Sequence, residues 1–517
     1  MIIANQKYFI LFILFNINLI LISTFIIYES KWYIYIFILA LASILYSFSS
    51  LILLIKKICN KNNNNYDIKR LLNPKNYIYI VPCYNESEQE LTNTLISLVY
   101  QRTVVGDKKS IIIVCDGMVK GKGNNLSTDK ILLNILNNKN DPIIYQYMTR
   151  YNKINKLYIY TGLFNNINYI LVIKKENAGK RDSLVLIRRI CYNYNLKKYK
   201  EYMNIFTNVF CDIYDNENIE YIIGIDADTV FEYNCSYELI KTMDTNDVYG
   251  CVGYVDINKN MNKFNPYVLY QYAEYMFAQC LKRQAQSNLT HKVNCLSGCN
   301  QILRICKETC GDDILSIFNY FPNENDNIFT HIRSIASEDR NHICLMFSLY
   351  PYVKTAQSLN AIAYTTVPTN KNIFLSQRRR WSLGANTNDL LLLELPNINI
   401  FERISSFIGV FIFSLSPFIF IATIMFIKSI IMHASMLMLY LSILMIIPFG
   451  YGLLIPIFIK QMNFKETMYY YISYLFFLTT GSIVNLIIYT YSLITMDTIK
   501  WGKTREIEDD IYIDIDI

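Results

Sequence analysis

Hydrophobic positions divide the 517-residue chain into two apolar ends and a mixed middle. Near the N-terminus, residues 8–28 and 32–55 carry no charged side chain. Because a helix needs about 20 apolar residues to cross a bilayer, both segments predict membrane helices joined as a hairpin. A cleaved signal peptide is the alternative for the first segment, but its apolar run is too long and no small-residue cleavage site follows it.

The middle of the chain alternates short apolar runs with longer amphipathic segments, from residue 77 to about residue 395. This alternation is typical of a βα-type domain. The apolar runs predict four strands, at residues 77–81, 111–114, 169–173 and 221–225. Each run ends in a polar cluster, so we expect the four strands to share one functional rim.

Three further apolar blocks follow Pro396, at residues 404–427, 430–459 and 469–494. The middle block is interrupted by four residues that disfavour a regular helix, Pro448, Gly450, Gly452 and Pro456. We therefore predict a kinked or broken helix there, which a membrane protein tolerates where backbone is buried in protein or lines a cavity.

Composition and charge agree with a membrane protein. Hydrophobic residues make up 52% of the chain and the mean hydropathy is +0.19. The net charge of +7 is spread along the sequence, which gives no case for nucleic acid as a partner. Lys56 and Lys57 follow the second apolar segment, so the positive-inside rule places the middle domain in the cytosol. Thirteen cysteines without C-x-x-C pairs favour neither a zinc site nor a disulfide framework.

Two carboxylates, Asp226 and Asp228, come directly after the apolar run at residues 221–225. Side chains two apart in a strand point the same way, so both carboxylates can converge past the end of the strand. Such a pair suits Mg²⁺ or Mn²⁺ that is shared with substrate phosphates. An aspartate-rich turn is the alternative that this pattern alone leaves open.

Three further polar clusters carry candidate chemistry, each with a plainer alternative. Asp116, after the second strand, can accept hydrogen bonds from a uracil or ribose, or serve as a turn residue. Lys180 and Arg181 can hold a diphosphate or form a solvated basic turn. In Ala336-Ser-Glu-Asp-Arg340, adjacent acids beside an arginine suit a general base or, alternatively, the first turn of an exposed helix.

The segment Gln377-Arg-Arg-Arg-Trp381 stands just ahead of the last membrane block. Its arginines can clamp a leaving diphosphate, and its tryptophan can stack on a sugar face. Juxtamembrane positive charge with an interfacial tryptophan is the alternative.

Taken in order, Asp116, the D-x-D pair, S-E-D-R and Q-R-R-R-W resemble the processive family-2 glycosyltransferases, and more closely the chitin synthases. Further matches lie at residues 81–86, 114–123, 179–183, 270–275, 295–299 and 501–505. The last of these, W-G-K-T-R, resembles the fungal synthases of the larger, multi-motif division. In one departure, Ser297 stands where the family's loop has proline, so that loop lacks the rigidity that proline gives.

The resemblance implies a GT-A fold, which is an α/β glycosyltransferase domain with a mixed, mostly parallel sheet, flanked here by transmembrane helices. It assigns the general base to Asp339, with Glu338 and Arg340 shaping its surroundings. It assigns the metal, Mg²⁺ or Mn²⁺, to Asp228. Substrate contacts are assigned to Glu86, Asp116, Lys180, Arg181, Asp226, Gln377, Arg378, Arg379, Arg380 and Trp381. The entrance of a translocation channel is assigned to the loop of Cys295, Leu296, Ser297, Gly298 and Cys299.

The implied activity is processive, inverting transfer of N-acetylglucosamine from UDP-N-acetylglucosamine to the 4-hydroxyl of a growing β-1,4 chitin chain, coupled to export. The implied location is the plasma membrane, with several spans in the lipid bilayer. The implied organisation is an N-terminal transmembrane hairpin (1–57), a cytosolic GT-A domain with an interfacial segment (58–400), a C-terminal transmembrane block (401–494) and a polar tail (495–517). The sequence leaves a homodimer and the side of the C-terminus open.

Two alternatives remain. A hyaluronan or cellulose synthase is the alternative within the enzymes, because the D-x-D, E-D and R-R-R-W core is shared. A channel or receptor with an inert cytosolic domain would be favoured by loss of Asp226, Asp228 or Asp339, and all three are present.

Overall fold

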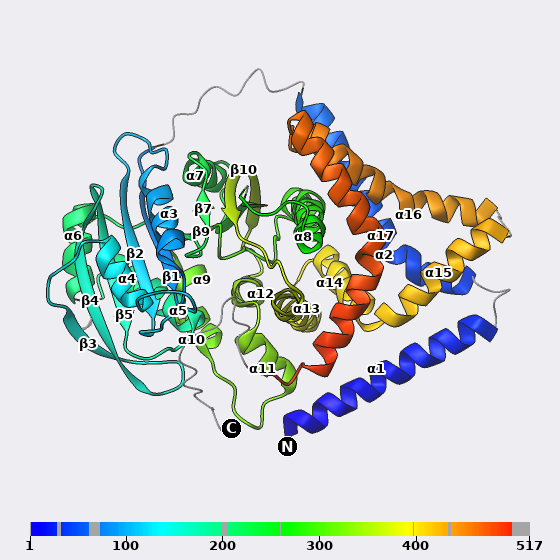
Figure 1. Ribbon diagram of the computed structural model, residues 1–517, viewed down its shortest axis with the longest axis horizontal. Helices are drawn as coiled ribbons and strands as arrows, with labels where there is room; N and C mark the ends of the chain where they lie inside the picture. The colour runs from blue at the N-terminus through cyan, green and yellow to red at the C-terminus, as the bar shows by residue number, and fades with distance from the viewer. Residues whose placement is uncertain are drawn as a thin grey trace.

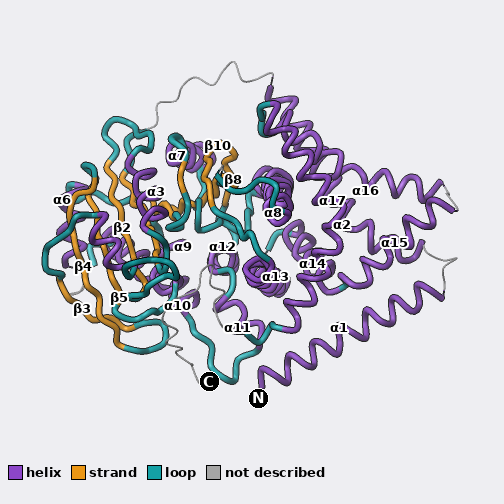
Figure 2. Tube along the Cα trace, in the orientation of Figure 1, coloured by secondary structure: helices purple, strands orange, loops and turns teal. Residues whose placement is uncertain are grey.

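The computed structural model describes residues 2–27, 33–61, 73–198, 204–258, 260–396, 398–432 and 436–498. Figure 1 shows a twisted sheet with its covering helices on the left and long helices on the right. Figure 2 shows the same division, because the strands lie in the left half and the right half is helical. The W-G-K-T-R motif at residues 501–505 lies outside the described residues.

The described strands form a ten-stranded sheet in the order β3-β4-β5-β2-β1-β6-β9-β8-β10-β7. Its strands are β1 (Asn76–Cys83), β2 (Lys108–Asp116), β3 (Ile143–Met148), β4 (Ile154–Phe164), β5 (Ile167–Lys174), β6 (Tyr221–Gly224), β7 (Val230–Phe231), β8 (Gly250–Ile257), β9 (Gln301–Arg304) and β10 (Thr355–Thr365). The four strands predicted from sequence are β1, β2, β5 and β6. They run side by side and parallel in the order β5-β2-β1-β6, so the expected shared rim is present.

Antiparallel strands flank this parallel centre on both sides. The hairpin of β3 and β4 extends one edge from β5, and β9 joins β6 on the other side. Parallel pairing is therefore confined to the centre and to β8 with β10. The β3–β4 hairpin was not predicted from sequence, because β3 is an edge strand whose apolar residues stay exposed, with Ile144 at 56% and Met148 at 59%.

Helices cover both faces of the centre, as a parallel sheet requires. Alternate residues of β1 point to opposite faces, so Tyr79 packs with Leu91 and Leu95 of α3 on one side. Ile80 packs with Ile187 and Phe210 on the other side. The covering helices are α3 (Glu88–Val99), α4 (Thr128–Ile135) and α7 (Cys235–Asn246) on the first face, and α5 (Lys180–Asn195) and α6 (Asn204–Tyr214) on the second.

A second group of helices links the sheet to the apolar end of the chain. It comprises α8 (Pro266–Phe277), η4 (Ala278–Arg283), η5 (Gln286–Thr290), α9 (Lys307–Cys310), α10 (Asp312–Asn319), α11 (Ile328–Ile335), α12 (Glu338–Leu349) and α13 (Lys371–Glu394). Of these, α8 and α13 pack directly against the long C-terminal helix α17 (Phe464–Ile494). The S-E-D-R motif on α12 and the Q-R-R-R-W motif on α13 therefore lie between the sheet and the apolar helices.

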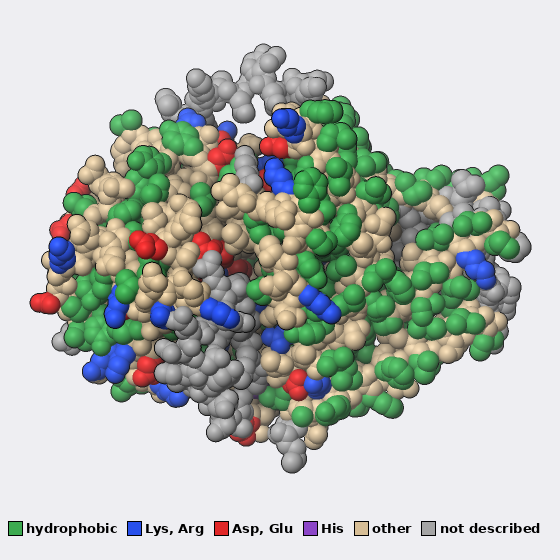
Figure 3. Space-filling view, in the orientation of Figure 1, with side chains coloured by type: hydrophobic (Ala, Val, Ile, Leu, Met, Phe, Trp, Pro, Cys, Tyr) green, Lys and Arg blue, Asp and Glu red, His purple; other side chains and the backbone are tan. Residues whose placement is uncertain are grey.

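Three of the described helical stretches are long and apolar enough to cross a membrane, Ile3–Ile27, Ser442–Ile459 and Phe464–Ile494. The second predicted segment forms the 29-residue helix α2 (Tyr33–Lys61), which packs against α16 (Met436–Leu454). Hydrophobic side chains cover much of the right half of the surface in Figure 3, where these helices lie.

One predicted span differs from the expectation. Residues 404–427 were expected to form a single helix, but they divide into α14 (Ile400–Ser414) and α15 (Ser416–Met432) with a bend of 82°. If this bent pair counts as one span, up to four spans are available among the described residues. The hydrogen bonds of Asn18 explain how the bend is held, because its side chain donates to the Ser414 carbonyl and accepts from the Phe418 N–H.

The predicted interruption of the middle block is present. Pro448 lies inside α16, and Pro456 lies in the π-helical turn η6 (Ile455–Ile459) that follows. Proline has no N–H to continue the helical ladder, and wider turns of this kind commonly mark such breaks.

Candidate active site

Acidic and basic side chains from three separate segments meet at the rim of the sheet. Asp226 follows β6, Lys180 begins α5, and Glu338 begins α12. The Lys180 Nζ lies 2.6 Å from Asp226 Oδ1 and 3.4 Å from Glu338 Oε1. The structure therefore brings together residues from D-x-D, G-K-R-D-S and S-E-D-R, which sequence reasoning had placed in one site.

The charge of Lys180 decides which of these groups ionise. Burial opposes its charge, but Asp226, Asp339 and Glu338 together raise the pKa of Lys180 well above its ordinary value. Burial also opposes ionisation of Glu338, yet Lys180 and Arg181 lower the pKa of that carboxyl below its ordinary value. Lys180 and Glu338 therefore form a charged pair within the rim.

Asp339 has the opposite environment from its neighbour Glu338. Burial and the Glu338 charge raise the pKa of Asp339 to about 7, although Lys180 opposes the shift. Its Oδ2 accepts a hydrogen bond of 2.8 Å from the Gly298 N–H. Its Oδ1 is buried and meets no hydrogen-bond donor among the described residues. One oxygen is thus anchored, and the other is buried without a hydrogen-bond partner among the described residues.

The loop of residues 295–299 lies directly against this carboxylate. A Cβ at Gly298 would come within 2.7 Å of Asp339 Oδ1, so only glycine fits there. On its other side, Ser297 Oγ accepts a hydrogen bond of 2.7 Å from Arg283 Nη2. The loop that sequence reasoning assigned to a channel entrance therefore contacts the candidate base.

The start of α12 is fixed by its close crossing with α13. Ser337 adopts a left-handed conformation with φ 53°, and its hydroxyl donates to the Arg380 carbonyl at 3.2 Å. A Cβ at Gly384 would lie 2.1 Å from Ser337 Oγ. Arg340 points away from the rim and forms a buried ion pair of 2.8 Å with Asp389 of α13. These contacts orient Glu338 and Asp339 toward the sheet.

Asp228 and Glu86 add further acids to the rim. Burial and the Asp226 charge raise the pKa of Asp228 to about 6. Burial, with a smaller contribution from Asp228, raises the pKa of Glu86 to about 7. Acids this close together are the arrangement expected around a cation.

The donor set is small for a metal site made of protein ligands alone. Among the described residues, there is no group of three or more His, Cys, Asp or Glu side chains placed to bind a metal together. The Asp226 and Asp228 pair nevertheless fits Mg²⁺ or Mn²⁺, which keep one or two protein carboxylates and take other ligands from water and substrate phosphates.

Asp116 is held by partners that sequence reasoning missed. Its Oδ1 accepts from the Ala178 N–H at 3.0 Å and lies 3.2 Å from Nζ of the fully buried Lys174. The same ammonium lies 2.7 Å from Asp182, which also accepts from the Tyr147 hydroxyl. Lys174 ends the apolar strand β5, at a position where burial is expected. A charged residue at such a position needs a buried partner, and this was the sequence signal for its ion pairs.

Arg181 lies apart from its neighbour Lys180. Its guanidinium donates to the carbonyls of Phe318 and Arg333 and to the side chain of Asn341. These contacts tie α5 to α10, α11 and α12. The assignment of Arg181 to a diphosphate stays a prediction, and these structural contacts do not favour it.

The Q-R-R-R-W motif lies on α13. Arg378 forms an ion pair with Glu274 of α8, and its guanidinium lies 4.3 Å from the Trp381 ring centroid. Trp381 is 41% exposed and faces Tyr275 with a centroid distance of 5.9 Å. An exposed indole beside an anchored arginine can stack on a sugar ring.

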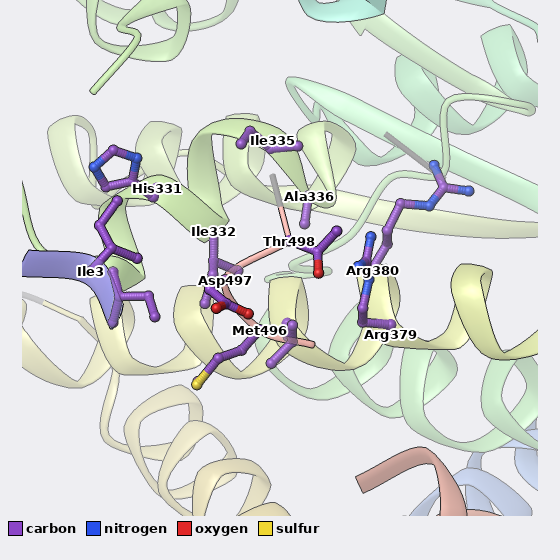
Figure 4. A pocket seen from close by; sticks show the side chains of 12 residues that line it. Ile3, His331, Ile332, Ile335, Ala336, Arg379, Arg380, Met496, Asp497 and Thr498 are labelled. Atoms are coloured by element: carbon purple, nitrogen blue, oxygen red, sulfur yellow. The ribbon is translucent and has the colours of Figure 1, made fainter. Parts of the chain in front are cut away.

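A pocket that adjoins this motif is shown in Figure 4. Isoleucines form much of its wall, and Arg380 is the lining residue whose charge also helps to lower the pKa of Glu338. The pocket lies outside the acidic rim and is formed between α1, α11, α13 and the end of α17. Its lining residues are Ile3, Ile328, His331, Ile332, Ile335, Ala336, Arg379, Arg380, Leu383, Met496, Asp497 and Thr498.

A mixed sheet with carboxylates at the ends of its central strands, flanked by apolar helices, agrees with the class that the motifs predict, a GT-A glycosyltransferase domain with membrane helices. Comparison with known proteins specifies the family. The family model described as chitin synthase matches residues 49–514. The chain therefore belongs to the chitin synthase family, which confirms the family recognised from its motifs, and chitin synthesis is the function that this membership supports.

Two curated relatives agree with this family. Chitin synthase 8 of Gibberella zeae is 34% identical over 450 residues, which are 84% of this chain and 67% of that protein. Chitin synthase 8 of Verticillium dahliae is 34% identical over 386 residues, which are 67% of this chain and 62% of that protein. Among solved structures, a mannosyltransferase from Pyrobaculum calidifontis in complex with GDP-Man and Mn²⁺ covers 87% of this chain and 98% of its own, at 11% identity and a TM-score of 0.42.

The crossing of α12 and α13 generates a prediction. Gly384→Ala should force the two helices apart, because the new methyl group overlaps Ser337. Overpacking of this kind costs about 1–3 kcal/mol, so both the unfolding temperature in detergent and the turnover should fall. Gly481→Ala in α17 is the matched control, because a Cβ there meets nothing within 4 Å. An equal effect of the two substitutions would contradict the close crossing.

Proposed function

We propose that this chain transfers N-acetylglucosamine from UDP-N-acetylglucosamine to the 4-hydroxyl of a growing β-1,4 chain, with Asp339 as the general base. Family membership supports the class of product. The single observation that carries the mechanism is the Asp339 carboxylate, which has one oxygen anchored by Gly298 and the other buried without a hydrogen-bond donor among the described residues.

The pKa of Asp339 suits this role. A sugar hydroxyl is a weak nucleophile, and a base works best when its pKa lies near the working pH. With its pKa raised to about 7, Asp339 accepts a proton better than an ordinary aspartate does. It takes the proton of the 4-hydroxyl as that oxygen bonds to the anomeric carbon and the bond from that carbon to UDP breaks. A single displacement inverts the anomeric centre, so the α-linked donor gives a β-linked polymer.

Glu338 has a different task from Asp339. Lys180 and Arg181 keep it ionised, and its charge in turn is a cause of the raised pKa of Asp339. Two carboxyl groups with pKa values pushed apart are the pattern expected of an acid–base site. Glu338 therefore tunes the base, while Asp339 contacts the reacting hydroxyl.

The leaving diphosphate needs positive charge. Lys180 can turn from Asp226 toward a phosphate, because its side chain already lies at the rim between two acids. Asp228 and Asp226 would hold Mg²⁺ or Mn²⁺, which supplies charge stabilisation to departing UDP when bound. Trp381 and the arginines beside it would hold the acceptor end of the chain.

The product leaves, in this proposal, through the chain's own membrane helices, with the catalytic domain in the cytosol of a plasma-membrane protein. A polymer with many hydroxyls cannot cross hydrocarbon unaided, because each unpaired polar group costs several kcal/mol there. The broken segment of α16 and η6 supplies irregular backbone of the kind that lines polar conduits.

Asp339→Asn tests the base. We expect polymerisation to fall by roughly 10²–10⁴-fold, as for other lost acid–base groups, while UDP-N-acetylglucosamine binding survives. In the parent enzyme the rate should rise as the pH increases through about 7, because the ionised carboxylate is the active form. Asp247→Asn, at an exposed carboxylate paired with Arg304, is the matched control. Near-parental turnover of Asp339→Asn would refute the assignment.

Metal removal tests the D-x-D pair. Excess EDTA should abolish polymerisation, and added Mg²⁺ or Mn²⁺ should restore it. Asp228→Asn should raise the metal concentration that gives half-maximal activity, because one charged ligand is lost. Full activity of protein shown to be metal-free by elemental analysis would contradict this role.

Sealed vesicles test export. With the catalytic domain facing outward and UDP-N-acetylglucosamine added outside, chitin should accumulate in the lumen and resist added chitinase until detergent is introduced. Product that is fully chitinase-sensitive in intact vesicles would show synthesis without translocation.

A further inference from the structure

The loop of residues 295–299 is held at two points on either side of Gly298. After Gly298, the Asn300 side chain donates to the carbonyls of Tyr254 and Ala361, which fixes the loop to the sheet. Before Gly298, the only side-chain bond to Ser297 among the described contacts is the 2.7 Å bond from Arg283 Nη2. The same Arg283 nitrogen lies 4.0 Å from Cys295 Sγ. Arg283 is therefore the polar anchor of the first half of the loop, beside Leu296, which is buried in a core cluster with Val252 and Leu303.

Arg283 comes from a segment that is itself seated on the apolar helices. It ends the π-helical turn η4, whose Cys280 carbonyl accepts a hydrogen bond of 2.8 Å from the Tyr451 hydroxyl of α16. Cys280 and Leu281 are buried in one core cluster with Tyr470 and Tyr474 of α17. The anchor of the loop thus has a fixed position relative to α16 and α17.

The tolerance for movement at Gly298 is small. Its N–H donates to Asp339 Oδ2 at 2.8 Å, and its Cα is so close to the carboxylate that an added Cβ would lie 2.7 Å from Oδ1. A shift of the loop toward Asp339 would make a clash, and a shift away would break the hydrogen bond. A displacement of about 1 Å at a reacting group can cost roughly 10²-fold in rate.

We propose that Arg283 is a positioning residue of the transferase, which holds the Gly298 N–H against Asp339 through its hydrogen bond to Ser297. This inference rests on the proposed function, because it takes Asp339 as the base. It adds a chain of contacts, from the apolar helices through η4 and the loop to the base, that D-x-D, S-E-D-R and Q-R-R-R-W do not contain.

The test compares substitutions at both ends of the Arg283–Ser297 bond. Arg283→Ala and Ser297→Ala should each lower kcat by about tenfold or more, since the base loses its fixed geometry. The KM for UDP-N-acetylglucosamine should change by less than about twofold, because neither side chain is among the residues proposed to contact the donor. Ser297→Thr keeps a hydroxyl acceptor and should restore kcat to within about threefold of the parent value.

Lys282→Ala is the matched control. It removes a basic side chain from the adjacent position of η4, and among the described contacts Lys282 makes no hydrogen bond to the loop. Its kcat should equal that of the parent. Unfolding temperatures in detergent, measured for all variants, separate a loss of positioning from a loss of folded protein, and Ser297→Thr carries the test if Arg283→Ala does not fold.

Three results would overturn the inference. The first is a kcat of Ser297→Ala within twofold of the parent value. The second is a rise in KM with kcat unchanged, and the third is a kcat of Ser297→Thr that stays as low as that of Ser297→Ala. The proposed function fails separately, through an active Asp339→Asn variant. If Asp339→Asn is inactive and Ser297→Ala is normal, the base stands and the positioning role of Arg283 is wrong.

Discussion

The acidic rim depends on the ion pairs that the Lys180 ammonium group forms with Asp226 and Glu338. Four carboxylates, from Asp226, Asp228, Glu338 and Asp339, approach one another at the ends of the central strands and the start of α12. Leaving buried carboxylates without a partner costs several kcal/mol each. Lys180 contacts two of them directly, and this allows the fold to hold the cluster together.

One ammonium group does not stabilise all four carboxylates equally. The pKa values of Glu338 and Asp339 therefore shift in opposite directions. Although burial opposes this, Lys180 lowers the pKa of Glu338. Burial and the charge of Glu338 raise the pKa of the adjacent Asp339. Two neighbouring residues of one helix therefore acquire different protonation behaviour without a difference in chemistry. In the proposed function, a divalent cation held by Asp228 would offset the same shortage of positive charge.

The helix α12, which carries the proposed base Asp339, packs against α13, which carries the Q-R-R-R-W motif. Ser337 contacts α13 at Arg380 and Gly384, and Arg340 pairs with Asp389 one turn further along. Asp389 in turn accepts a hydrogen bond of 3.5 Å from Ser406 of α14. Buried polar contacts thus link α12, α13 and α14.

Much of this arrangement could be predicted from sequence, and the rest could not for physical reasons. The buried central strands were visible because they are continuous apolar runs ending in polar clusters, as at residues 221–228. The β3–β4 hairpin was missed because an edge strand need not show a buried pattern. The 82° bend between α14 and α15 was missed because an apolar run shows that a segment is hydrophobic but not where its helix axis changes direction. Lys174 was missed because its partners, Asp116 and Asp182, are defined only by the fold.

For individual site residues as well, the sequence did not show which groups surround each side chain. Lys180 and Arg181 are adjacent in sequence and were given one role, yet they point to different surroundings because successive residues of a helix lie about 100° apart. Motif spacing located Asp339, but the features that support its proposed role as a base are the Gly298 N–H and the burial around it. Gly298 lies 41 positions away in the chain.

The most direct test of the account is a structure of the protein with a non-transferable UDP-N-acetylglucosamine analogue and a short chitin oligomer. We expect the terminal 4-hydroxyl to lie within about 2.6–3.2 Å of Asp339 Oδ1, while Gly298 keeps its bond to Oδ2. We also expect Lys180 to turn from Asp226 toward the diphosphate. A 4-hydroxyl bound instead to Glu338 or Asp226, with Asp339 Oδ1 still without a partner, would contradict the account.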